Sequence, residues 1–151
     1  MVTIDHRLAQ PSIDPALEPP PNESVVPMGE LCIALWSLFM FDVVTVLGRF
    51  PSVYKRMKNC QVSSDVQIGA DATKRLCTVI DVACSMYPKQ ALCLQRAVAT
   101  TSLLRRYGIR AELVIGVHQI PLDAHAWVEV DGEVVNDKRK VQEVYQVLDR
   151  C

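Results

Sequence analysis

A change of pattern at Gly108 constrains the fold of this chain more than any other feature. Before Gly108, apolar residues recur at helical spacing, most clearly from about Ala91 to Tyr107. After it come strand-like runs, the first of them Leu113 to Val117, and Asp131-Gly132 separates the next two as a strong hairpin signal. The sequence therefore predicts an α+β fold, in which N-terminal helices are followed by a small antiparallel sheet.

Helical spacing and turn residues divide the chain further. Arg105 and Arg106 suit the C-terminus of a helix, and Gly108 supplies the left-handed residue that ends it. Asp71 is expected to cap an earlier helix. The predicted helices cover residues 29–48, 53–58, 71–87 and 91–107, with a loop over 59–69. The predicted strands cover residues 111–118, 125–130 and 133–137, and residues 139–149 are expected to form a short helix.

The 151 residues suit one domain preceded by a short arm. Residues 1–28 hold six of the nine prolines, a density that excludes a regular helix or a central strand. We expect an extended or disordered arm over 1–28 and a single domain over 29–151. The arm is either a free tail or a segment that wraps on the domain or on a partner.

Residues 31–47 are almost continuously apolar. The run is shorter than the roughly 20 residues that a membrane span needs, and it contains Asp42, which would cost about 2.5–3.5 kcal/mol in a bilayer. We expect a buried helix. The alternative is a helix whose exposed apolar face docks on a membrane or on another protein.

Charge and cysteine usage exclude several classes of function. The formal net charge is −1, so bulk electrostatics would not attract the chain to nucleic acid. None of the six cysteines forms a CxxC pair, so we predict neither a metal site nor a cofactor. The polar, Pro-rich start carries no secretory signal, which indicates reduced thiols and a cytoplasmic location.

Three residues in the second half of the chain could carry out nucleophilic chemistry together. Cys93 falls at the expected start of a helix, His125 in a strand, and Asp137 at the end of the next strand. A carboxylate that orients an imidazole, which in turn takes the proton of a thiol, produces a nucleophile able to attack a carbonyl. We therefore predict Cys93, His125 and Asp137 as a catalytic triad.

The position of Cys93 separates it from the other cysteines. The first turn of a helix presents unpaired backbone N–H groups and the positive end of the helix dipole, which favour the thiolate and can also bind an oxyanion. Gln90 is close enough in sequence to be a second oxyanion donor. Cys77 and Cys84 are expected mid-helix, where no such field exists. The alternative for any of these cysteines is a role as a small apolar core residue.

The loop between the last two strands decides whether His125 and Asp137 can meet. A two-residue Asp131-Gly132 loop would place Ala126 opposite Asp137 and turn His125 to the other face. A three-residue loop with Gly132 in a bulge would place His125 directly opposite Asp137. We predict the bulged loop, and we expect the catalytic pairing to fail if a two-residue turn and divergent side chains are found together.

Trp127 lies two residues after His125 and so shares its face of the strand. It could shield the His125–Asp137 pair or line a substrate cleft, and we predict it with Gln90 as a substrate-binding residue. Core packing is an equal alternative for Trp127.

The motifs around these residues resemble those of the leader peptidases of lasso-peptide biosynthesis, a branch of the transglutaminase-like, papain-related cysteine hydrolases. The resemblance covers about residues 85–150, and its order and spacing make it specific. It rests on five segments: residues 93–98, 103–108, 113–117, 124–129 and 134–137.

This resemblance implies a function beyond what the residues alone indicate. Members remove the leader from a ribosomally made precursor peptide, and a separate ATP-dependent cyclase then closes the core into a lasso. The arm is too short for the leader-binding RiPP recognition element that some members carry. The resemblance therefore implies the stand-alone peptidase form, in which a separate recognition-element protein delivers the precursor and the lasso cyclase is a further candidate partner. It gives Cys93 the role of nucleophile, His125 that of general base and then general acid, and Asp137 that of orienter.

Two other functions are compatible with the same sequence. A transglutaminase-like acyl transferase would use the same triad and thioester and differ only in whether an amine or water attacks. A non-catalytic scaffold that binds a partner would keep the fold and leave the triad idle. The precursor, its cleavage site and the oligomeric state do not follow from the sequence.

Overall fold

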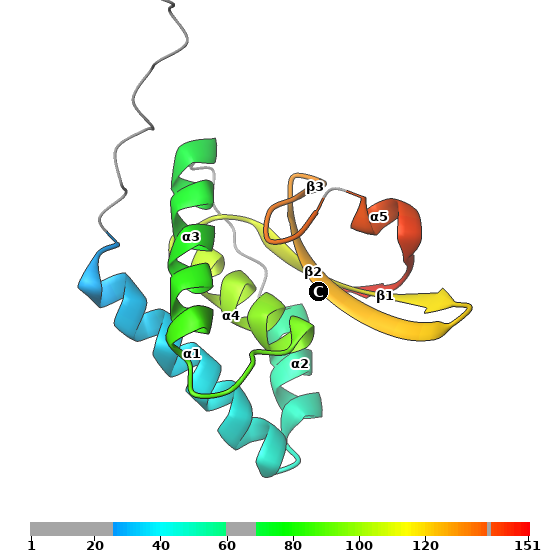
Figure 1. The fold of residues 1–151 in the computed structure, drawn as a ribbon, viewed down its shortest axis with the longest axis horizontal. Helices are drawn as coiled ribbons and strands as arrows, with labels where there is room; N and C mark the ends of the chain where they lie inside the picture. Colours follow the sequence, from blue (N-terminus) through cyan, green and yellow to red (C-terminus); the bar gives the residue numbers. More distant parts are fainter. Residues whose placement is uncertain (1–25, 60–68, 139) are drawn as a thin grey trace, which may run out of the picture.

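The computed structural model describes residues 26–59, 69–138 and 140–151. The predicted arm over residues 1–28 and the predicted loop over 59–69 lie almost wholly outside these residues. Helices come first and the sheet follows, as the change of pattern at Gly108 predicts (Figure 1). The elements are α1 (Met28–Val46), α2 (Phe50–Asn59), α3 (Ala70–Met86), α4 (Cys93–Arg106), β1 (Ala111–Gln119), β2 (Leu122–Val130), β3 (Glu133–Val134), α5 (Val141–Val144) and β4 (Gln146–Arg150).

The four strands form one antiparallel sheet in the order β3-β2-β1-β4. Helix α4 contacts α1 and α3 on one side and β1 and β2 on the other, and Figure 1 shows it between α3 and the sheet. The predicted α+β class is therefore confirmed, with the Cys93 helix packed on the sheet.

Alternating side chains give the sheet two different faces. Toward the helices, β1 and β2 place Leu113, Ala126 and Val128 in the main apolar core. The other face carries Val114 and Trp127, which pack with Val141 of α5 in a second, smaller apolar cluster. We call these the helix face and the α5 face of the sheet.

A buried carboxylate organises the α5 face. Glu129 is 1% exposed, and it accepts hydrogen bonds from Trp127 Nε1 at 2.7 Å and from Gln142 Nε2 at 2.8 Å. Arg150 of β4 forms an ion pair with the same carboxylate. Because a buried charge is costly unless it is paired and hydrogen-bonded, these partners are what allow Glu129 to lie inside the protein.

The turn between β2 and β3 differs from the prediction. Val130 lies opposite Glu133, so Asp131 and Gly132 form a two-residue turn, and both have positive φ angles, of 52° and 81°. This is the conformation that an Asp-Gly pair favours, and its twist matches that of the strands. The hairpin signal was right, but the predicted three-residue bulged loop is wrong.

The C-terminal segment also differs from the prediction. The expected helix over residues 139–149 is limited to α5, and the chain then extends as β4 beside β1. Cys151 continues this pairing, since it exchanges two backbone hydrogen bonds with Leu113. The helical spacing was misleading because Val144 and Leu148 are exposed, while pairing with β1 satisfies the backbone.

Helix α1 is only partly the buried helix that its composition predicts. Ala34 and Leu38 are fully buried against α3 and α4, whereas Trp36 and Phe39 are 61% and 48% exposed. By length and apolar composition alone the helix could also cross a membrane. It therefore combines a buried side with the exposed apolar side that the alternative prediction described.

Candidate active site

Cys93 is the first residue of α4, two residues later than the predicted helix start. Arg96 makes the first backbone hydrogen bond of the helix, to the carbonyl of Leu92, so the N–H groups of Cys93, Leu94 and Gln95 precede the intrahelical ladder. The thiol is half-buried. Cys93 thus occupies the helix N-terminus that the prediction requires for thiolate and oxyanion stabilisation.

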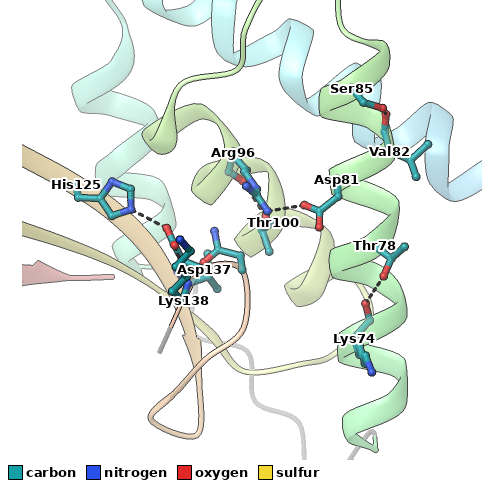
Figure 2. A network of polar contacts seen from close by, with 12 residues as sticks. Lys74, Thr78, Asp81, Val82, Ser85, Arg96, Thr100, His125, Asp137 and Lys138 are labelled. Carbon is teal, nitrogen blue, oxygen red and sulfur yellow. Dashed lines mark hydrogen bonds and ion pairs between the residues drawn. The ribbon is translucent and has the colours of Figure 1, made fainter. Parts of the chain in front are cut away.

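His125 and Asp137 are hydrogen-bonded to each other. His125 Nε2 lies 2.6 Å from Asp137 Oδ2, and the two side chains are 25% and 31% exposed (Figure 2). An ionised carboxylate only accepts hydrogen bonds, so Nε2 carries the proton. The unprotonated Nδ1 of a neutral imidazole is then the atom able to take a proton from a thiol.

A side chain in the β2–β3 hairpin explains how the pair forms despite the two-residue turn. Val135 still donates its N–H to the carbonyl of Val128, but the N–H of Val128 goes to Asn136 Oδ1 at 2.7 Å. The amide of Asn136 therefore replaces a backbone carbonyl in the ladder, and the chain leaves the sheet after β3. This departure brings Asp137 to His125. The two-residue turn is therefore found without divergent side chains, and the predicted pairing of His125 with Asp137 forms.

The surroundings of Asp137 favour its charged form. Partial burial alone would raise its pKa, but the hydrogen bonds from His125 and from the backbone N–H of Lys138 lower it below the usual value. The guanidinium of Arg96, one turn into α4, also lowers the pKa and ion-pairs with Asp81 at 2.5 Å (Figure 2). At neutral pH Asp137 is an anion able to hold an imidazole or an imidazolium.

Tyr145 stacks on His125 and also interacts electrostatically with Cys93. The Tyr145 ring stacks on the imidazole of His125, with centroids 5.2 Å apart. Its hydroxyl has a raised pKa, first because it donates to Asp123, then through burial, and further through the electrostatic influence of Asp123, Cys93 and Asp137. Among the described residues, the Cys93 thiol makes no hydrogen bond to His125. Such contacts are often long without substrate and shorten in the reacting complex.

Asp42, the carboxylate in the apolar helix α1, holds the segment that leads to Cys93. It accepts a hydrogen bond from the Tyr87 hydroxyl at 2.6 Å and one from Gln95 Nε2 at 3.2 Å, and it pairs with Lys89 at 2.6 Å. Tyr87 and Lys89 precede Cys93 and Gln95 follows it, so one carboxylate ties both sides of the nucleophile to α1. The contact raises the pKa of Tyr87 to about 12, which keeps the hydroxyl a donor.

The other predicted substrate-binding residues have different environments. Trp127 is completely buried and donates to Glu129, which favours the core-packing and shielding alternatives over direct contact with substrate. Gln90 is exposed in the loop between α3 and α4, three residues before Cys93, and its role as an oxyanion donor stays a prediction. Within the described ranges, no cluster of three or more His, Cys, Asp or Glu residues could hold a metal ion.

Other cysteines lack the setting of Cys93. Burial raises the pKa of Cys77 to about 11, and burial also raises the pKa of Cys84 and of Cys151. Cys32 is exposed on α1, far in sequence from the other candidate residues. Of the described cysteines, Cys93 alone combines partial exposure with a helix N-terminus.

Sequence reasoning did not assign functional positions to Tyr145, Asn136 or Asp42. The sequence did hold a signal for Asp42, a charged residue inside an apolar helix. Tyr145 falls within the helix expected over residues 139–149, and only the folded structure shows that its ring reaches His125. Asn136 carried no local signal, since its partner lies eight residues away across the hairpin.

The fold and these residues define an α+β protein with a cysteine at the start of a central helix and a His–Asp pair on an antiparallel sheet. The family model described as the transglutaminase-like superfamily matches residues 37–150, so the chain belongs to this superfamily. The resemblance predicted from the sequence is thereby confirmed at this level.

A more specific similarity concerns the microcin J25-processing protein McjB of Escherichia coli. The two chains are 39% identical over 56 residues, which is 37% of this chain and 27% of McjB. The match therefore spans about a quarter of the relative's length. No solved structure matches the chain significantly.

Proposed function

We propose that this protein is a cysteine peptidase that removes the leader from a ribosomally made lasso precursor peptide. The observation that carries the proposal is the His125–Asp137 hydrogen bond of 2.6 Å, formed at strand β2, which contacts the helix that begins at Cys93. Similarity to a protein that processes microcin J25 supports the choice of a peptide substrate.

The proposed reaction has two halves. His125 Nδ1 takes the proton of the Cys93 thiol, and the thiolate attacks the carbonyl carbon of the leader–core amide. The oxyanion forms at the first N–H groups of α4, and the imidazolium protonates the leaving amine as the C–N bond breaks. Water, deprotonated by His125, then attacks the thioester and releases the leader carboxylate and the thiol. Asp137 holds the imidazole in the required tautomer throughout.

The proposed partners follow from the same resemblance. A separate recognition-element protein would bind the leader and raise the effective concentration of the precursor at Cys93. The released core would then be the substrate of the ATP-dependent lasso cyclase. This pathway agrees with the expected cytoplasmic location, and the isolated chain should show weak basal cleavage.

The test uses the Cys93→Ala variant with a lasso precursor peptide and its recognition-element protein. We expect the variant to keep its circular dichroism spectrum and to lose cleavage by at least about 10³-fold. Undiminished cleavage would remove Cys93 from the mechanism.

Acyl transfer is the alternative that the same triad supports, because the thioester can react with either water or an amine. Mass spectrometry of the released leader distinguishes the two reactions. A free carboxylate indicates hydrolysis, and a leader amide formed with an added amine indicates transfer. A scaffold without activity would give neither product.

A further inference from the structure

Tyr145 lies against two ring side chains of β2, those of His125 and Trp127. It lies between α5 and β4, and its ring centroid is 5.2 Å from that of His125 and 6.3 Å from that of Trp127. His125 and Trp127 are neighbours on one face of β2, with centroids 6.4 Å apart and planes inclined by 22°. The three rings therefore form one cluster, in which Tyr145 stacks on His125 and makes a tilted contact with Trp127.

Two further residues hold Tyr145 in this place. Its hydroxyl donates a hydrogen bond of 2.7 Å to Asp123 Oδ2, two residues before His125 on the same face of β2. Gly116, the β1 partner of His125, leaves room for the cluster. A Cβ at this glycine would lie 2.7 Å from Trp127 Cη2 and 3.0 Å from Tyr145 Cβ, so any larger residue would push the rings apart.

We propose that Tyr145, tethered by Asp123, is a positioning residue that fixes the His125 imidazole for its reaction with Cys93. This inference rests on the peptidase proposal and goes beyond it, since nothing in the triad of Cys93, His125 and Asp137 requires an aromatic residue beside it. The stacked ring prevents the imidazole from rotating away from Asp137. Its face also lies within the 6 Å at which an aromatic ring stabilises a cation, so it favours the imidazolium that forms when Cys93 is deprotonated.

The charged surroundings are compatible with this role. Asp137 and Tyr145 contact the imidazole directly. The charged and titratable groups around these two are Asp123 of β2 and Cys93 of α4, which act on Tyr145, and Arg96 of α4, which acts on Asp137. His118 of β1 is in edge contact with Tyr145 at 6.2 Å. The hydrogen bond to Asp123, followed by burial, raises the pKa of the Tyr145 hydroxyl, so it stays protonated and keeps this bond.

The test measures alkylation of Cys93 by iodoacetamide between about pH 5 and pH 9 in the full chain. Peptide mass spectrometry reads Cys93 separately from the other cysteines. In Tyr145→Leu we expect the rate near neutral pH to fall about 3- to 10-fold and the midpoint of the profile to move to higher pH, because the thiolate–imidazolium pair is weaker. Tyr145→Phe retains the ring and should recover most of the rate. Val144→Ala, at the adjacent exposed position, is the matched control and should leave the profile unchanged.

An unchanged profile in Tyr145→Leu, with or without a lower melting temperature, would overturn the proposal and leave Tyr145 with a packing role. If Tyr145→Leu does not fold, Asp123→Ala releases the hydroxyl from the exposed end of β2. It should shift the profile in the same direction by a smaller amount, and no shift would likewise overturn the proposal.

His125→Ala separates this inference from the peptidase proposal. If that variant alters Cys93 alkylation and Tyr145→Leu does not, only the positioning role fails. If His125→Ala leaves the alkylation profile unchanged, the pairing of Cys93 with His125 fails, and the positioning role fails with it.

Discussion

The helix face and the α5 face of the sheet are stabilised by different interactions. On the helix face, Leu113, Ala126 and Val128 pack against α4 as part of the main apolar core. On the α5 face, the apolar cluster of Val114, Trp127 and Val141 is small. Most of the specific contacts there are polar and converge on buried Glu129.

This difference matches the location of His125, which lies on the α5 face, whereas Cys93 begins the helix that packs on the helix face. Apolar burial has no preferred direction, so the helix face can hold the sheet firmly without fixing the angle of any one side chain. Hydrogen bonds and ring stacking are directional, and they fix Trp127 beside His125 and Tyr145 over it. The α5 face therefore buries fewer apolar side chains but fixes the orientation of the rings around His125. General acid–base chemistry requires such a fixed orientation.

Asp137→Asn should give the largest effect of the variants considered, and it should reduce activity while leaving stability almost unchanged. An amide in place of the carboxylate can donate to Nε2 and so select the wrong imidazole tautomer, and we expect cleavage to fall by about 10²–10⁴-fold. The pair is partly exposed, so stability should change by less than about 1 kcal/mol. Precursor cleavage and thermal unfolding measured on one preparation check both halves, and a large loss of stability would contradict this division.

Leu113→Ala tests how much the helix face contributes to stability. Leu113 is completely buried on the helix face, and its truncation should lower the free energy of unfolding by about 2–5 kcal/mol. Val114→Ala is the matched control, since Val114 is equally buried one residue away on the α5 face. Urea unfolding should show a smaller loss for Val114→Ala, because fewer apolar atoms are removed. The two variants would contradict the comparison if the order were reversed.

Glu129→Gln tests the polar network and its pH dependence. Burial would raise the pKa of Glu129, but hydrogen bonds from Arg150, Gln142 and Trp127 lower it. A lowered folded pKa means that the charge stabilises the fold above the unfolded value of about 4.3, and that this stabilisation is lost as pH falls through the folded value. We expect Glu129→Gln to lose about 1–3 kcal/mol at pH 7 and to show a flatter decline in acid.

Unfolding free energies measured from pH 7 to pH 3 check this prediction. If wild type and Glu129→Gln declined in parallel over that range, Glu129 would not be the source of the acid sensitivity.

Asp42→Asn should have the smallest effect, and it tests whether polar contacts on the helix side of the molecule also influence the geometry at Cys93. Asp42 of α1 bonds to residues on both sides of Cys93, so it can influence the position of the thiol. Asn retains an acceptor for Tyr87 but loses the ion pair with Lys89, so we expect kcat for cleavage to fall about 2- to 5-fold. Phe39→Ala, on the exposed side of α1, is the control and should leave kcat unchanged. Equal effects of the two variants would indicate that α1 contributes only general stability.

Much of the fold was predictable because it is encoded locally. Helix α4 follows from its apolar spacing and from Gly108, which lies just after the end of the helix and has a φ of 80°. The β2–β3 turn follows from Asp131-Gly132, although the loop length was wrong. The prediction required a longer loop to bring Asp137 to His125. In the structure the two residues meet because the Asn136 side chain takes the place of a backbone carbonyl in the ladder and the chain then leaves the sheet.

The missed features all depend on partners distant in sequence. Strand β4 could not be recognised from residues 146–150 alone, because its pairing with β1 decides its conformation. The position of Tyr145 over His125 depends on that pairing. Asp42 bonds to Tyr87 and Gln95, which lie 45 and 53 positions later in the sequence. The spacing of apolar residues gives no information about contacts at that separation.

By itself the sequence determined the order of helices and strands, the place of Cys93 at a helix start and the presence of His125 on a strand, because spacing and turn chemistry act over a few residues. The tertiary structure alone decided that Asp137 reaches His125, that Tyr145 stacks on the imidazole and that Asp42 ties down the segment before Cys93. Those contacts require chain segments to meet after folding, and the free energy that brings them together comes from burial of the whole core.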